Sequence, residues 1–541
     1  MKYAGYDCVV IEGRSESPVY VWIDDSVVEI RDATFLWGKT IPETEEIIRN
    51  ELADQNIKVL CIGPAGENLV HSSPIFSGDH AGGRAGCGEI MGFKRLKAVA
   101  VRGTQGVQVA GPDVFEKNCD EVRKTLDLKE AKDPWIISFS VFGSLSVVRI
   151  FNECYQLHSF NCQRLEWEKA ENLVAELYLK DYVTKPEACF CCPFPSCGQF
   201  FRIKEGEFAG TKGANIRAGT CIALGSLLGI DNLPAVLKMQ SLCNQLGLDY
   251  FHVGYTIAWA MECYEKGILS DKDTGGIKLN FGDYKAAIEV IKMIAYRTGF
   301  GNILAEGAQK ASRIIGRGSE KYALTVKGQE LETMPLRTLY TAALGVATSE
   351  VGPDHTRWYP PYIPNPALIP KGFLRKIGID AANLETFKAT STKNKGVLLK
   401  FLSDRAAVIE SLPGCIFVCV RGRLGFDFKL WGEVLTSATG VVFNEEELLK
   451  SGERIVNLER SFNVREGFRR SHDVLPGRIL EENVPNSIYK AISREDFNCM
   501  LDSYYEARGW TRDGVPTEKK LKELQLEEVI NDFRTLNILR G

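Results

Sequence analysis

The chain has 541 residues, of which 45% are hydrophobic and 25% are charged, and its formal net charge is −4. A net charge so close to zero excludes the broad basic surface that attracts nucleic acid or anionic lipid. No apolar run is long enough to cross a bilayer, and the N-terminus lacks the apolar region and cleavage site of a signal peptide. The sequence therefore predicts a cytoplasmic globular protein of several domains, with no nucleic-acid or membrane partner.

Short β-branched segments bounded by polar residues predict strands in the first hundred residues. They lie at 6–12, 19–24, 27–31, 58–62 and 96–101. Asp24-Asp25-Ser26 predicts a hairpin turn between the second and third of these strands. A short helix is expected from Pro42 or Glu43 to Glu51.

Helical signals dominate the rest of the chain. Asp231 or Asn232 can cap a helix that has Pro234 in its first turn, and Gly247 is well placed to end it. Apolar residues recur on one stripe of this segment, as in an amphipathic helix. Further helices are expected near 256–266 and 283–294.

Most of the sixteen cysteines predict buried, reduced thiols. Disulfide frameworks belong to small secreted domains, and this is a large chain without an export signal. Isolated cysteines in apolar runs, such as Cys61, Cys154 and Cys263, behave as small hydrophobic residues.

One cysteine cluster is different. Cys189, Cys191, Cys192 and Cys197 place four thiols within nine residues. Zinc sites commonly use two separate C-x2-C pairs, whereas iron–sulfur clusters tolerate a compact three-cysteine run and one distant cysteine. No second C-x2-C follows, so the spacing favours an iron–sulfur cluster over zinc, with Cys191 pointing away. Spacing alone does not choose the fourth ligand among Cys221, Cys243, Cys415 and Cys419.

The glycine-rich segment 82–88 precedes the predicted strand at 96–101. A dinucleotide-binding fingerprint has the strand before the glycines, so that interpretation is excluded. Glycines let the backbone approach an anion, and exposed N–H groups can hold phosphate. Phosphate binding and a simple tight turn both remain open from these residues.

His355 lies in a polar loop beside Asp354 and Arg357. Histidine is well suited to proton transfer near neutral pH. A lone loop histidine is more often a surface residue, so both interpretations remain open.

The order of several motifs along the chain resembles the aldehyde:ferredoxin oxidoreductase family. The motifs are Trp37-Gly38-Lys39, Ile62–Leu69, Gly83–Gly86 with Met91-Gly92, the cysteine cluster, Leu246–Asp249, Gly452-Glu453-Arg454, and Tyr504-Tyr505 with Arg508–Trp510. The resemblance implies an α+β fold in which an N-terminal β-sandwich-like domain is followed by two mainly α-helical domains. The corresponding domain boundaries are 1–108, 109–325 and 326–541.

The resemblance also implies cofactors and a reaction. Two pterins would hold tungsten (or molybdenum), with magnesium bridging their phosphates, beside one [4Fe–4S] cluster. An aldehyde or a related carbonyl or acyl substrate would be oxidised, and electrons would pass to ferredoxin or an electron-transfer subunit. Cluster ligands map to Cys189, Cys192, Cys197 and Cys415, and His355 maps to the proton donor or acceptor near the metal. Pterin-binding positions map to Ala81, Gly83, Arg84, Asn244, Leu248, Asp249, Arg357, Glu410, Gly414 and Ile416.

Four departures from the family pattern bear on this assignment. The cysteine run has four residues between its second and third cysteines, where the family has three. Asn244 and Glu410 each stand where the family has aspartate, and an amide lacks the stronger, charge-assisted hydrogen bond. The pair that binds a bridging iron in some dimers falls at Lys238 and Ser241, so a homodimer would lack that iron. A glutamate near the metal in aldehyde-oxidising members falls at Gly219.

Met1 aligns with the middle of the family's N-terminal domain, so about the first hundred residues of the pattern are expected to be missing. A half-built sheet would expose an edge and an apolar face. Three alternatives therefore stay open: a separate polypeptide supplies the remainder, the chain start is wrong, or the protein no longer binds two pterins. The preferred hypothesis is a tungsten-pterin, iron–sulfur oxidoreductase. The alternative is a non-catalytic iron–sulfur electron-transfer or scaffold subunit with a degraded pterin site.

Overall fold

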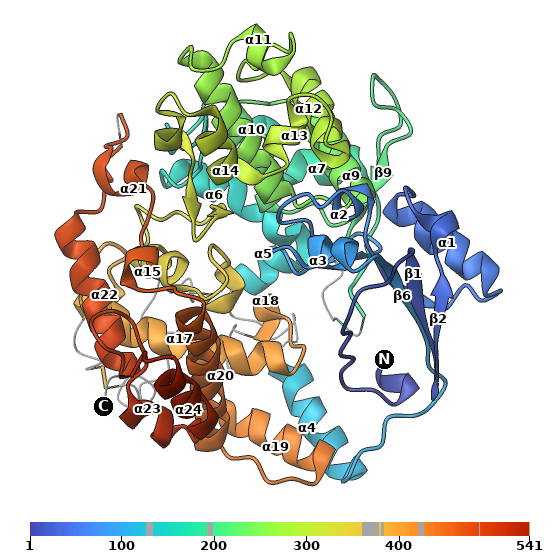
Figure 1. The fold of residues 1–541 in the computed structure, drawn as a ribbon, viewed down its shortest axis with the longest axis vertical. Coiled ribbons are helices and arrows are strands. Elements are labelled where there is room, and N and C mark those ends of the chain that lie inside the picture. Colours follow the sequence, from blue (N-terminus) through green and yellow to red (C-terminus); the bar gives the residue numbers. More distant parts are fainter. Residues whose placement is uncertain are drawn as a thin grey trace. The chain divides into compact units, whose positions relative to one another are not determined.

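The computed structural model describes residues 1–125, 134–190, 192, 198–359, 378–379, 384–419, 427–485 and 487–539. The chain forms two compact units (Figure 1). Unit 1 contains Met1–Gln108 and Ser138–Thr333, and unit 2 contains Val109–Ile137 and Met334–Gly541. A compact unit can hold more than one domain, so the three-domain division at 108 and 325 stays a prediction.

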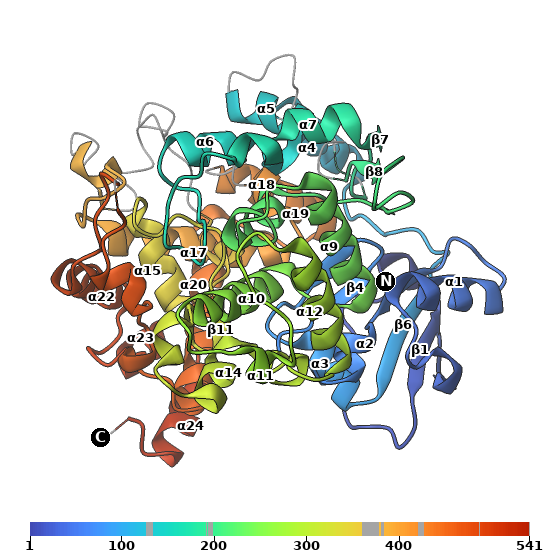
Figure 2. The ribbon, with the colours of Figure 1, turned by 90° about the horizontal axis from the view of Figure 1, so that it is seen from above.

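Unit 1 begins with a six-stranded sheet of order β2-β1-β6-β3-β4-β5. Its strands are β1 (Val19–Asp24), β2 (Val27–Asp32), β3 (Lys58–Cys61), β4 (Ile75–Ser77), β5 (His80–Gly82) and β6 (Leu96–Arg102). The β1–β2 hairpin pairs Asp24 with Val27, which confirms the predicted turn. β6 runs parallel to β1, and Figure 2 shows them side by side.

Alternation along β1 sends its side chains to two core clusters, one on each face of the sheet. Tyr20 and Trp22 of β1 lie in a core cluster with α1 (Ile41–Glu51). Val21 and Ile23 face the other way and pack in a second cluster. The predicted strand at 6–12 is wrong, because this segment contributes partly buried side chains to the second cluster without joining a β-ladder.

The helical part of unit 1 centres on α9 (Leu233–Leu246) and α10 (Tyr250–Glu265). Asn232 caps α9 by accepting a hydrogen bond from the Ala235 N–H (3.1 Å), and Gly247 ends it at φ 79°. α10 begins six residues before the predicted start, because the Asp249 side chain caps it by accepting from the His252 N–H (2.7 Å).

The remaining elements assigned to unit 1 complete this part of the chain. They are α2 (Pro64–Glu67), α3 (Cys87–Phe93), α6 (Val147–Glu153), α7 (Ala175–Asp181), β7 (Val183–Lys185), β8 (Phe200–Arg202), β9 (Lys212–Gly213), α8 (Ala218–Ala223), α11 (Asp271–Thr274), α12 (Tyr284–Tyr296), α13 (Gly301–Leu304), α14 (Gly307–Ile315), β10 (Thr325–Val326) and β11 (Gln329–Glu330). Helix α5 (Pro134–Phe142) spans the boundary between the units.

Unit 2 packs around α17 (Lys395–Ser411), which lies against α20 (Glu445–Arg465) and α22 (Arg494–Arg508). Close packing is possible because Gly452 of α20 faces the Asp404 carbonyl, where a Cβ would collide. Asp404 also forms a buried ion pair with Arg508 of α22. One carboxylate therefore joins the central helix to a neighbour.

Unit 2 is otherwise helical in its described part. Its other helices are α4 (Pro112–Thr125), α15 (Tyr340–Thr348), α18 (Ile416–Cys419), α19 (Phe428–Thr439), α21 (Gly477–Glu481), α23 (Glu518–Glu523) and α24 (Glu527–Thr535). The predicted α+β class, with an N-terminal sheet followed by helical parts, is confirmed. No single described helix is long and apolar enough to cross a membrane, although the bent pair Ala218–Leu228 and Leu233–Leu246 passes by length and composition.

Candidate functional site

The glycine-rich segment continues from the β4–β5 hairpin in unit 1. Gly78 has a positive φ of 58° in the two-residue turn, which is the position where a type II′ turn requires glycine. Ala81 pairs with Phe76 in this hairpin. Gly83 (φ 68°) then turns the chain, and its carbonyl accepts from the Cys87 N–H (3.0 Å). An exposed loop whose turn requires glycine therefore follows directly after the short strand β5.

Arg84 connects this loop to two other segments of unit 1. Its Nη2 donates to the carbonyl oxygens of Glu330 (2.9 Å) and Leu331 (3.3 Å). Its Nε lies 3.6 Å from Oδ1 of Asp249, and the guanidinium lies over the Phe251 ring. The structure therefore brings together two predicted pterin-binding residues, Arg84 and Asp249, that are 165 positions apart.

The α9–α10 loop approaches the sheet through two glycines. A Cβ at Gly63 would lie 2.5 Å from the Leu246 carbonyl oxygen and 2.8 Å from the Gly247 nitrogen. Leu248 is buried in this loop, with its N–H donating to the Cys243 carbonyl (2.9 Å). Glycine at 63 is thus the only residue that lets the loop lie this close.

Asn244 lies in the last turn of α9, and its Nδ2 donates to Oδ1 of Asp79 in the hairpin turn (2.9 Å). Burial raises the pKa of Asp79, and hydrogen bonds from Asn244 and the Ala214 N–H partly offset that rise. The predicted residues Ala81, Gly83, Arg84, Asn244, Leu248 and Asp249 therefore belong to one linked group of segments in unit 1.

A buried histidine–carboxylate pair stands behind this group. Nδ1 of His252 contacts the Glu330 carboxylate, which also accepts from the Ala308 N–H (2.7 Å). Burial opposes ionisation of Glu330, but His252, the Ala308 N–H and His71 outweigh it and hold the pKa of Glu330 below its ordinary value. Sequence reasoning missed this pair, because no local motif links residues 78 positions apart.

His71 extends the buried pair toward α3. Its ring centroid lies 5.8 Å from that of His252, and its Nδ1 lies 3.6 Å from Oε2 of Glu89. The hydrogen bond with Glu89 raises the pKa of His71 despite the opposing effect of burial.

Gly219, which stands where the resemblance places a glutamate, is surrounded by aromatic side chains. A Cβ at this position would lie 2.6 Å from Cζ of Phe251 and 3.2 Å from the Tyr250 hydroxyl. Burial raises the pKa of Tyr250 to about 12, so this phenol stays protonated at neutral pH. The space that a larger residue at 219 would need is filled by Tyr250 and Phe251.

The cysteine loop is described only in part. Cys189 and Cys192 are partly exposed and flank one turn, in which the Cys192 N–H donates to the Cys189 carbonyl (3.0 Å). Nε2 of His80 lies 3.4 Å from Sγ of Cys189. Cys197 and Cys191 lie outside the described residues. Among described residues, no three His, Cys, Asp or Glu side chains gather in a metal-binding arrangement.

Burial separates the candidates for the fourth cluster ligand. Cys415 is exposed in unit 2, whereas Cys221, Cys243 and Cys419 are buried. Burial raises the pKa of Cys221 to about 12 and that of Cys243 further. Because the thiolate is the metal-binding form, an exposed thiol suits the role better.

His355 and Arg357 lie together in a short 3₁₀ turn, His355–Arg357, of unit 2. Nη1 of Arg357 lies 2.9 Å from Oε1 of Glu459 and 3.3 Å from Oε2 of Glu410. Burial raises the pKa of Glu410, although Arg357 partly offsets that effect. The His355 ring lies 5.8 Å from the ring of Phe417. Sequence reasoning gave Glu459 no role beside Arg357, because it lies 102 positions away on another helix.

The loop after α17 carries the other predicted residues of unit 2. The Gly414 N–H donates to the Ile409 carbonyl (2.9 Å), and Ile416 is buried beside Ile409. Ile416 thus anchors this loop to α17, while Glu410 on the same helix faces Arg357.

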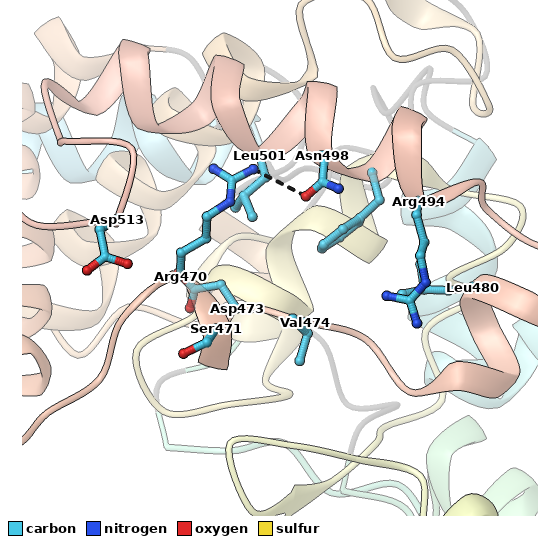
Figure 3. Close-up of a pocket in the computed structure, with 10 residues that line it drawn as sticks. Arg470, Ser471, Asp473, Val474, Leu480, Arg494, Asn498, Leu501 and Asp513 are labelled. Carbon is cyan, nitrogen blue, oxygen red and sulfur yellow. Dashed lines mark hydrogen bonds between the residues drawn. The ribbon is translucent and has the colours of Figure 1, made fainter.

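Unit 2 also contains a cavity of about 390 Å³ that none of the predicted residues lines. Figure 3 shows Arg470 and Arg494 on its walls. Arg470 already binds Asp502 (2.6 Å) and Asn498 (3.2 Å), and Arg494 binds Glu481. Both arginines that line this cavity are therefore already paired with neighbouring side chains.

The loop in unit 1 has the features of a site for a phosphate-bearing ligand. The N–H groups of Gly83 and Ala85 have no hydrogen-bond acceptor among the described residues, and both residues are exposed. Arg84 places a cation beside them, and Asp79 and Asp249 place carboxylates at the adjoining loop. Anion-binding N–H groups next to carboxylates suit a ligand with a phosphate tail and an amino-bearing ring.

An N-terminal sheet followed by helical parts, a glycine-rich loop and a partly described cysteine loop are the features that the sequence led us to expect of a cofactor-dependent oxidoreductase. The family model "Aldehyde ferredoxin oxidoreductase, N-terminal domain" matches residues 1–103, and "Aldehyde ferredoxin oxidoreductase, domains 2 & 3" matches residues 121–526. The chain belongs to the aldehyde ferredoxin oxidoreductase family and is an oxidoreductase.

Relatives match along nearly the whole chain. It is 35% identical over 539 residues to the tungsten-containing aldehyde ferredoxin oxidoreductase of Pyrococcus abyssi, covering 98% of this chain and 83% of that protein. It is 29% identical over 563 residues to the aliphatic sulfonate oxidoreductase, WOR-like subunit, of Pyrococcus furiosus. That match covers 99% of this chain and 83% of that protein.

A solved structure is similar as well. It is the active site complex BamBC of benzoyl coenzyme A reductase with 1,5 dienoyl-CoA, with a TM-score of 0.82 and 26% identity over 100% of this chain and 84% of that chain.

The expectation that about the first hundred residues of the family pattern are missing is wrong, because the N-terminal domain model matches residues 1–103. Alternate residues of β1 pack in core clusters on both sides of the N-terminal sheet, within unit 1.

Proposed function

We propose that this chain is a low-potential oxidoreductase that acts on an aldehyde or a related carbonyl or acyl substrate. Two pterins would hold tungsten or molybdenum, with magnesium at their phosphates, and one [4Fe–4S] cluster would pass electrons to ferredoxin or a partner subunit. The observation that carries this proposal is the convergence of Arg84, Asp249 and the Asp79–Asn244 pair on the glycine-rich loop. The tungsten-containing relatives support the choice of metal.

The residues of this chain have separate roles in the proposal. Gly83, Arg84 and Ala81 would hold the phosphates, while Asp249 would bind the pterin ring. Cys189, Cys192, Cys197 and Cys415 would hold the cluster. The metal–pterin centre supplies the two-electron chemistry when bound. His355 would give or take a proton at an imidazole nitrogen, and Arg357, held by Glu410 and Glu459, would keep a positive charge beside it.

A second candidate is a non-catalytic iron–sulfur electron-transfer or scaffold subunit. The crowding at Gly219 favours it, because Tyr250 and Phe251 fill the position where aldehyde-oxidising relatives have a glutamate. The same crowding is consistent with a non-aldehyde substrate, such as those named for the sulfonate and benzoyl-CoA relatives.

A turnover assay separates these candidates. Protein purified without oxygen from a tungsten-supplemented host is mixed with aldehydes and an oxidised low-potential acceptor, and acceptor reduction is followed optically. Aldehyde-dependent reduction supports the proposal. A loaded enzyme that reduces the acceptor only with sulfonates or acyl-CoA esters would change the substrate class. A protein that exchanges electrons but turns over no substrate would favour the subunit.

A further inference from the structure

A chain of three hydrogen bonds, all donated in the same direction, runs through the buried part of unit 1. The Thr220 hydroxyl donates to Oε1 of Gln240 (3.0 Å), and Nε2 of Gln240 donates to Oδ1 of Asn244 (2.8 Å). Nδ2 of Asn244 then donates to Oδ1 of Asp79 (2.9 Å). The chain links α8, α9 and the β4–β5 turn and ends on a carboxylate.

The direction of this chain explains why an amide stands at 244. A carboxamide has a donor and an acceptor end, whereas an ionised carboxylate only accepts. Gln240 needs an acceptor at 244, and Asp79 needs a donor there. A carboxylate at 244 would meet Asp79 without a proton between them, and like charges at this distance repel strongly in a buried setting.

Asp79 keeps acceptor capacity for a ligand. A carboxylate can accept about four hydrogen bonds, and among described residues Asp79 receives two, from Asn244 and from the Ala214 N–H. Asp79 is partly exposed and directly precedes β5, the strand that contains Ala81 and leads into Gly83. Asp79 therefore presents its carboxylate at the edge of the same loop that offers the free N–H groups.

We propose that Asp79 supplies an anionic acceptor for the amino-bearing pterin ring, and that Asn244 is the residue that positions it. In this protein the carboxylate lies in the hairpin turn, at Asp79, instead of at position 244 near the end of α9. The hydrogen bonds that run from Thr220 through Gln240 and Asn244 hold it there. The inference rests on the proposed function for the identity of the ligand.

Three variants test the inference: D79N, N244D and the swap D79N/N244D. All are produced in a host that makes the pterin and is supplied with tungsten. The readouts are pterin content by fluorescence after oxidation, tungsten content by mass spectrometry, and melting temperature. D32N is the matched control, because Asp32 is an exposed residue at the end of β2 that accepts hydrogen bonds from Thr34.

D79N keeps an acceptor for Asn244 and removes only the charge. We expect it to retain the melting temperature while its pterin content falls at least about tenfold, the effect of losing a charged hydrogen bond. N244D should lose both stability and pterin. The swap restores one donor and one carboxylate, so it should regain the melting temperature and most of the pterin. D32N should match the wild type.

Wild-type pterin content in D79N would overturn the inference. If D79N were unstable, its pterin content per folded chain, measured below its melting temperature, would decide instead, and wild-type content there would overturn the inference. A wild-type protein that carries neither pterin nor tungsten would overturn the proposed function, and the assignment of the ligand with it. The melting temperatures of the three variants would then show whether Asp79 and Asn244 are coupled as a pair.

Discussion

Nδ1 of His252 and the Glu330 carboxylate form a buried contact behind the glycine-rich loop of unit 1, with side chains 2% and 1% exposed. The backbone groups of these two residues also contact Arg84 or its partner Asp249. The Glu330 carbonyl accepts from Arg84, and the His252 N–H donates to Asp249, the carboxylate beside Arg84. Arg84, Asp249, His252 and Glu330 thus form a closed ring of contacts that fixes the start of α10.

E330Q should destabilise the protein by about 3–5 kcal/mol at neutral pH, because removing one partner of a buried pair leaves the other without compensation. The pKa of Glu330 lies below its ordinary value of 4.5, so its ionised form stabilises the fold above pH 4.5. That contribution is lost as the pH falls through the lowered pKa. Melting curves of wild type and E330Q should therefore differ most near neutral pH and converge in acid. A difference in melting temperature that stays the same at every pH would contradict a stabilising role for the Glu330 carboxylate.

R84A should lower pterin content at least about tenfold, since Arg84 both offers charge to the ligand and holds Asp249 and the Glu330 carbonyl. R164A is a matched control, because Arg164 also lies over a phenylalanine ring but at the surface. Pterin analysis of both proteins makes the comparison. Full pterin in R84A would mean that the glycine-rich loop is only a turn.

G63A should destabilise unit 1 by about 1–3 kcal/mol or more, because its Cβ would overlap the Leu246 carbonyl and push away the α9–α10 loop. G106A adds the same methyl group where nothing lies within 4 Å, and it should leave the melting temperature unchanged. Equal melting temperatures for the two variants would show that the loop does not depend on this close approach.

H355A should reduce turnover by about 10²–10⁴-fold, the usual contribution of a positioned proton donor or acceptor. Metal and pterin content should stay at the wild-type level. H472Q is the control, because His472 is exposed in unit 2 and packs on Phe468. Unchanged turnover in H355A would assign His355 a structural role.

The local signals in the sequence predicted four of the six strands of the sheet, β1, β2, β3 and β6. The Asp24–Ser26 turn and the strands around 19–31, 58–61 and 96–102 follow from β-branched residues and short polar turns. The segment 6–12 has the same composition but finds no neighbouring strand, so it packs without a ladder. Propensity alone does not supply the partner that a strand needs.

The site was predictable where a motif is local and hidden where it depends on tertiary contacts. The glycine-rich loop and the α9–α10 loop were expected from the sequence, and the Arg84–Asp249 contact joins them. The contacts His252–Glu330 and Arg357–Glu459 were not expected, since each partner is ordinary within its own helix or strand. The roles of the cysteines, Cys197 among them, stay predictions.

The central claim is tested most directly by metal and pterin analysis of the wild-type protein purified without oxygen from a tungsten-supplemented host. The account predicts about four iron atoms per chain, as one [4Fe–4S] cluster requires, together with tungsten or molybdenum and pterin. Iron without tungsten, molybdenum or pterin would contradict it in favour of an electron-transfer subunit, and a protein without iron would contradict both.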